Sequence, residues 1–339
     1  MQPLLDWYDA GHRDLPWRTL PTPYRVWVSE IMLQQTRVEA VRGYFARWME
    51  ALPDIPALAA ADEAVYTKLW EGLGYYSRVR NLHRAAVLLC AQYGGELPAD
   101  CDKLLSLPGV GEYTAGAVAS IAFGLPVPAV DGNVLRVAAR LGSDFTPITD
   151  TKFKKQTRER FAALMPSDRP GDLNQALMEL GATVCVPNGA PHCGDCPIQH
   201  LCEGFHRGNA AVLPLRAAKK ARRIENRTVL LVRCGELVGL RQRPKKGLLA
   251  GLWELPSLDG HLPPDELRAA LTEKGWSVRK LLSLRPAKHI FTHVEWHMNS
   301  VYVELDEPAP ALTFVTPAAL RADYALPSAF RSFVSVLED

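Results

Sequence analysis

The sequence has no long apolar run, and its two kinds of charge nearly cancel. Among its 339 residues, 39 basic side chains face 37 acidic ones, which leaves a net charge of +2. No apolar stretch is long enough to span a bilayer, and the first residues lack the basic start and apolar core of a signal peptide. We therefore expect a cytoplasmic protein with no membrane partner, and the overall charge does not by itself indicate a nucleic-acid partner.

Cysteine is scarce, with seven residues in the chain, and we expect no disulfides in the cytoplasm. Four of them fall within eighteen residues with the spacing C-x7-C-x2-C-x5-C: Cys185, Cys193, Cys196 and Cys202. Four thiolates this close together suit a tetrahedral zinc ion or a four-iron cluster. Zinc sites usually have two close pairs and this segment has one, so the spacing predicts a metal without choosing between zinc and iron.

The length suggests two domains, and the residue pattern changes along the chain. Residues 1–213 have apolar positions at helical spacing, punctuated by Gly and Pro, and predict an all-α domain. Residues 225–339 contain short stretches rich in β-branched, aromatic and alternating residues, such as Thr228–Val232 and Val294–Leu305, with one helix at Asp265–Lys274. They predict an α+β domain, joined to the first by a linker over residues 214–224.

Basic residues gather around this linker. Between Arg216 and Lys246 there are eleven Lys or Arg against two acids, Glu225 and Glu236. Taken alone, such a run indicates a solvated linker more than a binding surface.

Two acids stand in unusual surroundings. Glu30 lies inside VWVSEIML, a largely apolar helical segment, where a charge needs a reason. It is either a salt-bridged or surface residue or a functional one. Asp131 follows PVPAV and begins DGNVLRV, where an ordinary helix N-cap would also explain it. A pair of carboxylates, one protonated and one ionised, is what glycosidic-bond cleavage requires.

The segment Leu107-Pro-Gly-Val-Gly111 is a tight glycine turn between two helical pieces. Such a turn leaves backbone N–H groups free to hold a phosphate. A simple helix–helix turn is the alternative interpretation, and the turn alone favours it.

Together these motifs resemble one family. LPGVGEYTAGAV followed by VDGNVLRV resembles the helix-hairpin-helix DNA glycosylases of the endonuclease III superfamily. SEIMLQQTRV, GLGYYSRVRNLHRAA and the trailing cysteines are similar to the adenine DNA glycosylase (MutY) branch. GLLAGLWELP and Phe291-Thr292-His293 resemble that family's C-terminal 8-oxoguanine-reading domain, which has a Nudix-like fold. The motifs occur jointly and in order over nearly the whole chain, and this makes the resemblance specific.

The resemblance implies catalytic roles for four residues. It makes Glu30 the general acid that protonates adenine N7, and Asp131 the carboxylate that stabilises the sugar cation or briefly bonds to it. Asn133 would position Asp131. Tyr113 stands where the family's bifunctional relatives carry a Schiff-base lysine, so a monofunctional glycosylase is implied.

The resemblance also implies binding roles. Gln35, Thr36 and Tyr75 would wedge into the duplex around 8-oxoguanine, and Arg18 and Gln175 would line the adenine pocket. Backbone amides of the hairpin would hold a phosphate (Gly109, Val110 and Gly111), and the C-terminal loop would read the lesion (Thr292 and His293). The four clustered cysteines would bind a 4Fe–4S cluster.

The implied function is base excision repair on double-stranded DNA. The substrate would be adenine mispaired with 8-oxoguanine or guanine, flipped out of the duplex by an enzyme that we expect to be a monomer. An endonuclease III-like glycosylase-lyase or a thymine/uracil mismatch glycosylase is the alternative, and Tyr113 or the second domain argues against each.

The chain departs from the family pattern in three places. The first two cluster cysteines are separated by seven residues rather than six, and the loop between them, VPNGAPH, lacks the usual Lys or Arg for DNA. The lesion-reading loop is FTH rather than FSH. The C-terminal helix DELRAALTEKGW lacks the carboxylate row of Nudix hydrolases, so we expect recognition without hydrolysis.

Overall fold

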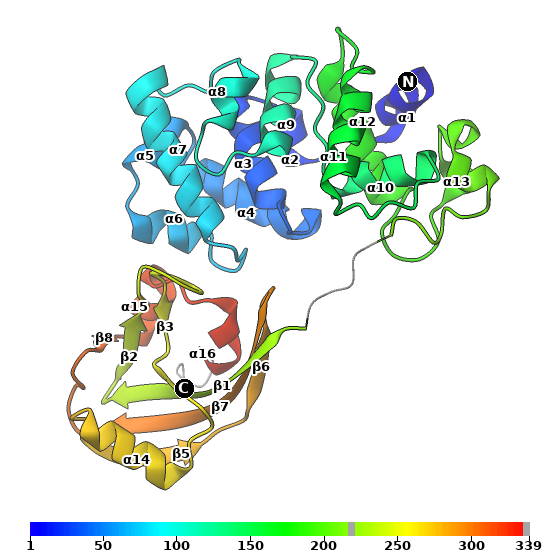
Figure 1. Cartoon of the computed structure of the whole chain (residues 1–339). Helices are drawn as coiled ribbons and strands as arrows, with labels where there is room; N and C mark the ends of the chain where they lie inside the picture. The colour runs from blue at the N-terminus through cyan, green and yellow to red at the C-terminus, as the bar shows by residue number, and fades with distance from the viewer. Residues whose placement is uncertain (216–220, 335–339) are drawn as a thin grey trace. The chain divides into compact units, whose positions relative to one another are not determined.

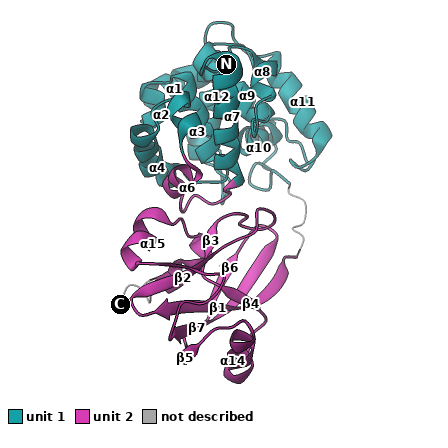
Figure 2. Ribbon diagram, turned by 90° about the vertical axis from the view of Figure 1, so that its left-hand side faces the viewer, with its two compact units in different colours: residues 1–61, 77–218 teal, residues 62–76, 219–339 magenta. Residues whose placement is uncertain are grey.

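A computed structural model describes residues 1–215 and 221–334, which form parts of two compact units (Figure 2). Unit 1 comprises residues 1–61 and 77–218, and unit 2 comprises residues 62–76 and 219–339. The predicted linker, residues 214–224, lies partly outside the described residues, as do Arg216, Lys219 and Lys220 of the basic run. The part of it that is described ends in strand β1 (Arg223–Cys234).

Unit 1 is helical throughout its described part. Its helices are α1 (Gln2–Gly11), α2 (Pro16–Thr19), α3 (Pro23–Leu33), α4 (Val38–Ala51), α5 (Ile55–Ala60), α7 (Ser77–Tyr93), α8 (Cys101–Leu105), α9 (Glu112–Phe123), α10 (Gly132–Leu141), α11 (Thr151–Ala162), α12 (Pro170–Thr183) and α13 (Glu203–His206), with 3₁₀ turns at Cys193–Asp195 and Gln199–Leu201 (Figure 1). Proline occupies the first turn of α1, α2, α3, α5 and α12, where its missing N–H costs nothing.

Helix α9, which packs on both α3 and α12, is mostly apolar. Helix α9 is rich in alanine, and Gly116 lets it approach the backbone at Pro128, since a Cβ there would lie 2.5 Å from the carbonyl oxygen. Helices α10 and α12 pack with α1 around a core that includes Leu4, Val137 and Leu180. Helix α12 also packs on α9, and α9 packs on α3.

Unit 2 is built on a mixed sheet with the order β3-β2-β1-β7-β5. Its strands are β1, β2 (Leu237–Gln242), β3 (Trp253–Glu254), β4 (Ser257–Asp259), β5 (Val278–Ser283), β6 (Ala287–Ile290), β7 (Val294–Leu305) and β8 (Thr313–Val315). Strands β1 and β7 run parallel over their full length, from Arg223 opposite Val294 to Cys234 opposite Leu305. The other neighbours in this order pair antiparallel, and so do β4 on β1, β6 on β7 and β8 on β2.

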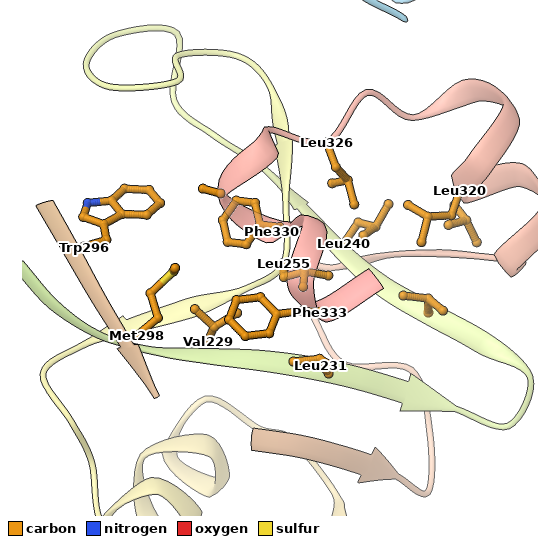
Figure 3. Packing of buried hydrophobic residues seen from close by; sticks show 13 residues of the cluster. Val229, Leu231, Leu240, Leu255, Trp296, Met298, Leu320, Leu326, Phe330 and Phe333 are labelled. Atoms are coloured by element: carbon orange, nitrogen blue, oxygen red, sulfur yellow. The ribbon is translucent and has the colours of Figure 1, made fainter. Parts of the chain in front are cut away.

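Both faces of this sheet are covered. Strand β1 is apolar at consecutive positions, and Leu230 faces α14 (Pro264–Glu273) while Val229 faces a second core. That second core contains Trp296, Phe330 and Phe333 (Figure 3). Residues from α15 (Pro317–Asp323), the 3₁₀ turn Ser328–Phe330 and α16 (Arg331–Val334) complete it. Continuous apolar strands are expected where a sheet is buried on both sides.

Residues 62–76, with helix α6 (Glu63–Leu69), group with unit 2 although the sequence pattern placed them in the helical domain. Lys68 Nζ donates to the Tyr324 carbonyl at 3.2 Å, and Glu71 accepts from the Leu326 amide at 2.8 Å. These polar contacts and the packing of α6 on α15 explain the grouping.

Among the helices that the structure describes, none combines the length and apolar character needed to cross a membrane.

Candidate active site

A cleft of about 870 Å³ opens in unit 1. Ten of the residues that the sequence singled out line it: Arg18, Glu30, Gln35, Thr36, Gly109, Gly111, Tyr113, Asp131, Asn133 and Gln175. They come from helices far apart in sequence, so only the fold brings them together. Val110 is buried, and Tyr75, Thr292 and His293 lie in unit 2.

Glu30 is buried on helix α3, with 5% of its surface exposed. Its carboxylate accepts a hydrogen bond from the Tyr113 hydroxyl, which also lies 3.3 Å from the Met178 sulfur. Burial raises the pKa of Glu30 to about 7, the charge of Asp131 adds to the rise, and Tyr113 and Arg18 oppose it. Glu30 is therefore neither a surface residue nor a partner in an ordinary salt bridge, and it can hold a proton near neutral pH.

Asp131 is the N-cap of α10 and also faces the cleft. It accepts hydrogen bonds from the Val134 amide at 2.8 Å and from Asn133 Nδ2 at 2.7 Å. Burial raises its pKa, while these donors and Arg136 oppose the rise. The capping role and the cleft position occur together, because one carboxylate oxygen caps the helix and the other meets Asn133.

Asn133 is itself held in place. Arg136 Nη2 donates to its side-chain oxygen at 2.8 Å, so its amide nitrogen is turned toward Asp131. Arg136 is buried and also donates to the carbonyls of Gly181 and Cys185.

One functional candidate escaped the sequence patterns. Glu179 on α12 lines the cleft with 2% of its side chain exposed, and it binds the guanidinium groups of Arg13 and Arg18 at 2.7 and 2.9 Å. In the sequence it stands in ALMELGATV, where one acid on a helix is unremarkable. The signal that could have identified Glu179 is its place beside the apolar helix positions Ala176 and Leu180, which are buried in the structure.

The hairpin is a tight turn whose geometry requires glycine at one position. Gly109 has a φ of +76°, and a Cβ there would lie 2.6 Å from that of Asn81. Gly111 is the N-cap of α9 and lines the cleft, and the first amides of such a helix have no acceptor within the helix.

Gln35 and Thr36 lie in a break between α3 and α4, although apolar residues recur at helical spacing from Tyr24 to Leu52 in the sequence. Gln35 has a φ of +59°, an unusual conformation for a residue with a side chain. Arg78 holds the break, because its Nη1 donates to the carbonyls of Ile31 and Gln34 at 2.8 and 2.5 Å.

Tyr75 and Thr292 meet within unit 2. Tyr75 also has a left-handed φ of +47°, and its hydroxyl lies 2.9 Å from the Thr292 hydroxyl. Thr292 and His293 are exposed in the turn between β6 and β7. Phe291 anchors this turn by packing on the ring of Trp296, with 4.8 Å between the ring centroids.

The four clustered cysteines line a single cavity, together with apolar residues such as Leu180 and Ile198. Arg140 Nη1 donates to Cys185 Sγ at 3.2 Å. Within residues 1–215 and 221–334, no three histidine, cysteine or acidic side chains are already arranged as a metal site. The fit to a metal therefore rests on the four thiols converging on one largely apolar cavity, which suits a thiolate-bound cluster better than an ion with oxygen ligands.

Two family comparisons define the class of the protein. Residues 28–165 match the HhH-GPD superfamily of base excision DNA repair proteins, and residues 228–336 match the NUDIX domain. The endonuclease III–DNA complex, a solved structure, is 26% identical with a TM-score of 0.52, and it covers 61% of this chain and 94% of its own. A thermostable thymine-DNA glycosylase is similar at 27% identity and a TM-score of 0.54, with the same coverages. The predicted fold class, a helical helix-hairpin-helix unit followed by a Nudix-like α+β domain, is confirmed.

Curated relatives narrow the class further. The mouse adenine DNA glycosylase is 39% identical over 91% of this chain and 71% of its own length. The human adenine DNA glycosylase is 37% identical over 93% and 68%, and that of Mycolicibacterium smegmatis is 40% identical over 68% and 79%. The chain belongs to the adenine DNA glycosylase family and is a DNA glycosylase of base excision repair.

Proposed function

We propose that this enzyme hydrolyses the N-glycosidic bond of adenine mispaired with 8-oxoguanine or guanine in double-stranded DNA. The observation that carries the proposal is the buried pair of carboxyl groups, Glu30 and Asp131, in one large cleft. A glycosidic bond breaks most easily when one acid protonates the leaving group and a carboxylate stabilises the sugar cation.

Glu30 is the proposed general acid. Because its pKa is raised to about 7, a large fraction carries a proton at neutral pH, ready for adenine N7. Tyr113 donates to its carboxylate and thereby fixes the direction in which the acid points.

Asp131 is the proposed stabiliser of the oxocarbenium ion, or the group that bonds to it briefly. The donors at its carboxylate favour the ionised form, and Asn133 fixes its orientation. Tyr113 has no amine to form a Schiff base, so we propose a monofunctional reaction without strand cleavage.

The remaining cleft residues fit a flipped adenine and a distorted duplex. Arg18 and Gln175 are proposed to line the adenine pocket, and the Gly109-Val110-Gly111 hairpin to hold a phosphate through backbone amides. Gln35, Thr36 and Tyr75 are proposed to fill the space that the extruded base leaves. The left-handed backbone at Gln35 and Tyr75 supports this role, because such strain gathers at functional sites.

Thr292 and His293 are proposed to read 8-oxoguanine. This lesion carries a hydrogen on N7 that guanine lacks, and a hydroxyl oxygen can accept it. The 2.9 Å contact between Tyr75 and Thr292 supports the proposal, since it joins a duplex-wedge candidate to the lesion-reading candidate. A single contact of this kind discriminates by about 1–3 kcal/mol, or roughly ten- to a hundred-fold.

Cys185, Cys193, Cys196 and Cys202 are the proposed ligands of a 4Fe–4S cluster. The cluster would serve to hold residues 185–206 in place, since hydrolysis transfers no electron. Arg140, which donates to Cys185 Sγ, would stabilise thiolate charge at the ligand.

The first test is base release by the full-length protein, which we propose acts as a monomer. Duplexes with A:8-oxoG, A:G, T:G and an oxidised pyrimidine are incubated with wild type, Glu30→Gln and Asp131→Asn. Adenine release by wild type, with a roughly 10²–10⁴-fold loss in Glu30→Gln and intact DNA binding, is expected. Release of thymine would instead support a thymine/uracil mismatch glycosylase. Strand nicking would support an endonuclease III-like glycosylase-lyase.

The second test concerns the lesion. Replacing Thr292 and His293 with alanine should lower the ratio of 8-oxoG to G affinity at constant salt while leaving adenine release from A:G intact. If the double variant keeps the wild-type ratio of 8-oxoG to G affinity, this turn does not recognise 8-oxoguanine.

A further inference from the structure

Glu179 is a buried carboxylate for which the chemistry above has no role. It accepts from the Arg13 backbone amide at 3.1 Å, from Arg13 Nε and Nη2 at 2.7 and 3.0 Å, and from Arg18 Nη2 at 2.9 Å. Burial alone would raise its pKa, but these donors hold the pKa below the ordinary value. Glu179 is therefore a fixed negative charge between two guanidinium groups.

Arg18 is fixed from three directions. Its Nη2 is bound to Glu179, its Nη1 donates to the Arg13 carbonyl at 3.0 Å, and its guanidinium lies 5.5 Å from the centre of the Tyr8 ring. Its side chain is only 12% exposed. An arginine held so firmly presents one face to the cleft and cannot easily turn toward another acid.

The nearby acid is Glu30. The charged or titratable groups that act on it are Tyr113 from α9, Asp131 at the start of α10, and Arg18 from α2. Arg18 alone among these three is a cation, and it stabilises the ionised form of Glu30. A free guanidinium in the cleft would pair with the Glu30 carboxylate and remove the proton that the general acid must carry.

We propose that Glu179 is a positioning residue that holds and neutralises Arg18, so that Arg18 lines the cleft without forming an ion pair with Glu30. The inference rests on the proposed role of Glu30. Glu179 touches neither of the proposed reacting carboxylates, and it acts only through Arg18.

The test is the pH dependence of single-turnover adenine release by the full-length enzyme from pH 5 to 9. Wild type should lose activity with rising pH as Glu30 deprotonates near pH 7. Glu179→Gln keeps the shape of the side chain but removes its charge. We expect the alkaline limb of the pH–rate profile, where the rate falls with rising pH, to move to lower pH by about one unit. The rate would then fall about tenfold at pH 8 and hardly at all at pH 5.5.

Three matched variants separate position from charge. Glu179→Asp retains the charge, so its limb should stay at the wild-type pH even if its rate falls. Arg13→Gln removes the other partner but leaves the pair of Glu179 with Arg18, and its limb should not move down either. The double variant Glu179→Gln with Arg18→Gln lacks the cation that acts on Glu30, and Arg13, which then has no acidic partner, is not among the groups that shift the Glu30 pKa. The alkaline limb of this variant should therefore return to the wild-type position or higher.

The proposal would be overturned if the alkaline limb of Glu179→Gln stayed at the wild-type pH. It would also be overturned if the alkaline limb of the double variant moved to lower pH. The double variant keeps the test decisive if the single variant does not fold, which thermal unfolding will show. If wild type has no alkaline limb, or if Glu30→Gln retains activity, the assignment of Glu30 fails instead.

Discussion

Replacing Glu30 with glutamine should make the protein more stable at alkaline pH while it destroys activity. The glutamine side chain keeps the shape of the native one and can still accept the hydrogen bond from Tyr113, so the packing of α3 is preserved. What disappears is a buried group that ionises. The native state holds the Glu30 proton up to about pH 7, whereas an unfolded chain releases it near 4.5.

This difference determines the sign and size of the effect. Between pH 4.5 and 7 the native state binds more protons than the unfolded state, so the free energy of unfolding falls as pH rises. The interval corresponds to roughly 3 kcal/mol at 1.36 kcal/mol per pH unit. The penalty is absent below pH 4.5 and complete above pH 7. Glu30→Gln removes it, which raises Tm by about 6–12 °C for a unit of this size.

The assay is thermal unfolding of wild type and Glu30→Gln at pH 5 and pH 8, followed by circular dichroism. The gain in Tm should be several degrees at pH 8 and much smaller at pH 5. Glu50→Gln, at an exposed position on α4, controls for the loss of a surface carboxylate. An equal gain at both pH values would refute the reasoning, because a packing effect does not depend on ionisation.

Three further variants test other parts of the site. Tyr113→Phe removes a donor that favours ionised Glu30, so the alkaline limb of adenine release should move to higher pH. Cys202→Ala should give protein with much less than the about four irons per chain expected of wild type, measured by iron analysis and visible absorption; an unchanged iron content would remove Cys202 from the ligand set. Gly109→Ala places a Cβ 2.6 Å from a side-chain carbon on α7 at a φ of +76°, so it should lower Tm and weaken DNA binding at least severalfold, whereas Gly111→Ala meets open space and should fold normally.

The sequence anticipated features that depend on local spacing. An acid in an apolar helix singled out Glu30, and a helix start singled out Asp131; the structure places both in one cleft. Glycine at 109 predicted a tight turn, and short stretches rich in β-branched, aromatic and alternating residues predicted strands such as β1 and β7. Each of these signals comes from a property of the neighbouring residues.

Features that depend on long-range packing were not predictable in the same way. The hydrogen bond from Tyr113 to Glu30 joins residues 83 positions apart. Glu179 is recognisable as a buried acid only once α12 is seen to pack beside Arg13 and Arg18. The break at Gln35 is likewise invisible in the apolar pattern, because the residue that stabilises it, Arg78, comes from another helix.

Three of the acids that line the cleft, Glu30, Asp131 and Glu179, have different environments, and these environments explain their different roles. Glu179 is paired with two cations and stays ionised, and Asp131 is supported by helix-capping donors. Glu30 is buried and feels the negative charge of Asp131, and the hydrogen bond from the Tyr113 phenol opposes these effects only in part, so Glu30 holds a proton most readily. Each deprotonated acid thus helps to keep Glu30 protonated, Asp131 by repulsion and Glu179 by engaging the nearby cation. The chemistry of the site follows from burial and from the neighbouring charges and donors, which differ among these three acids.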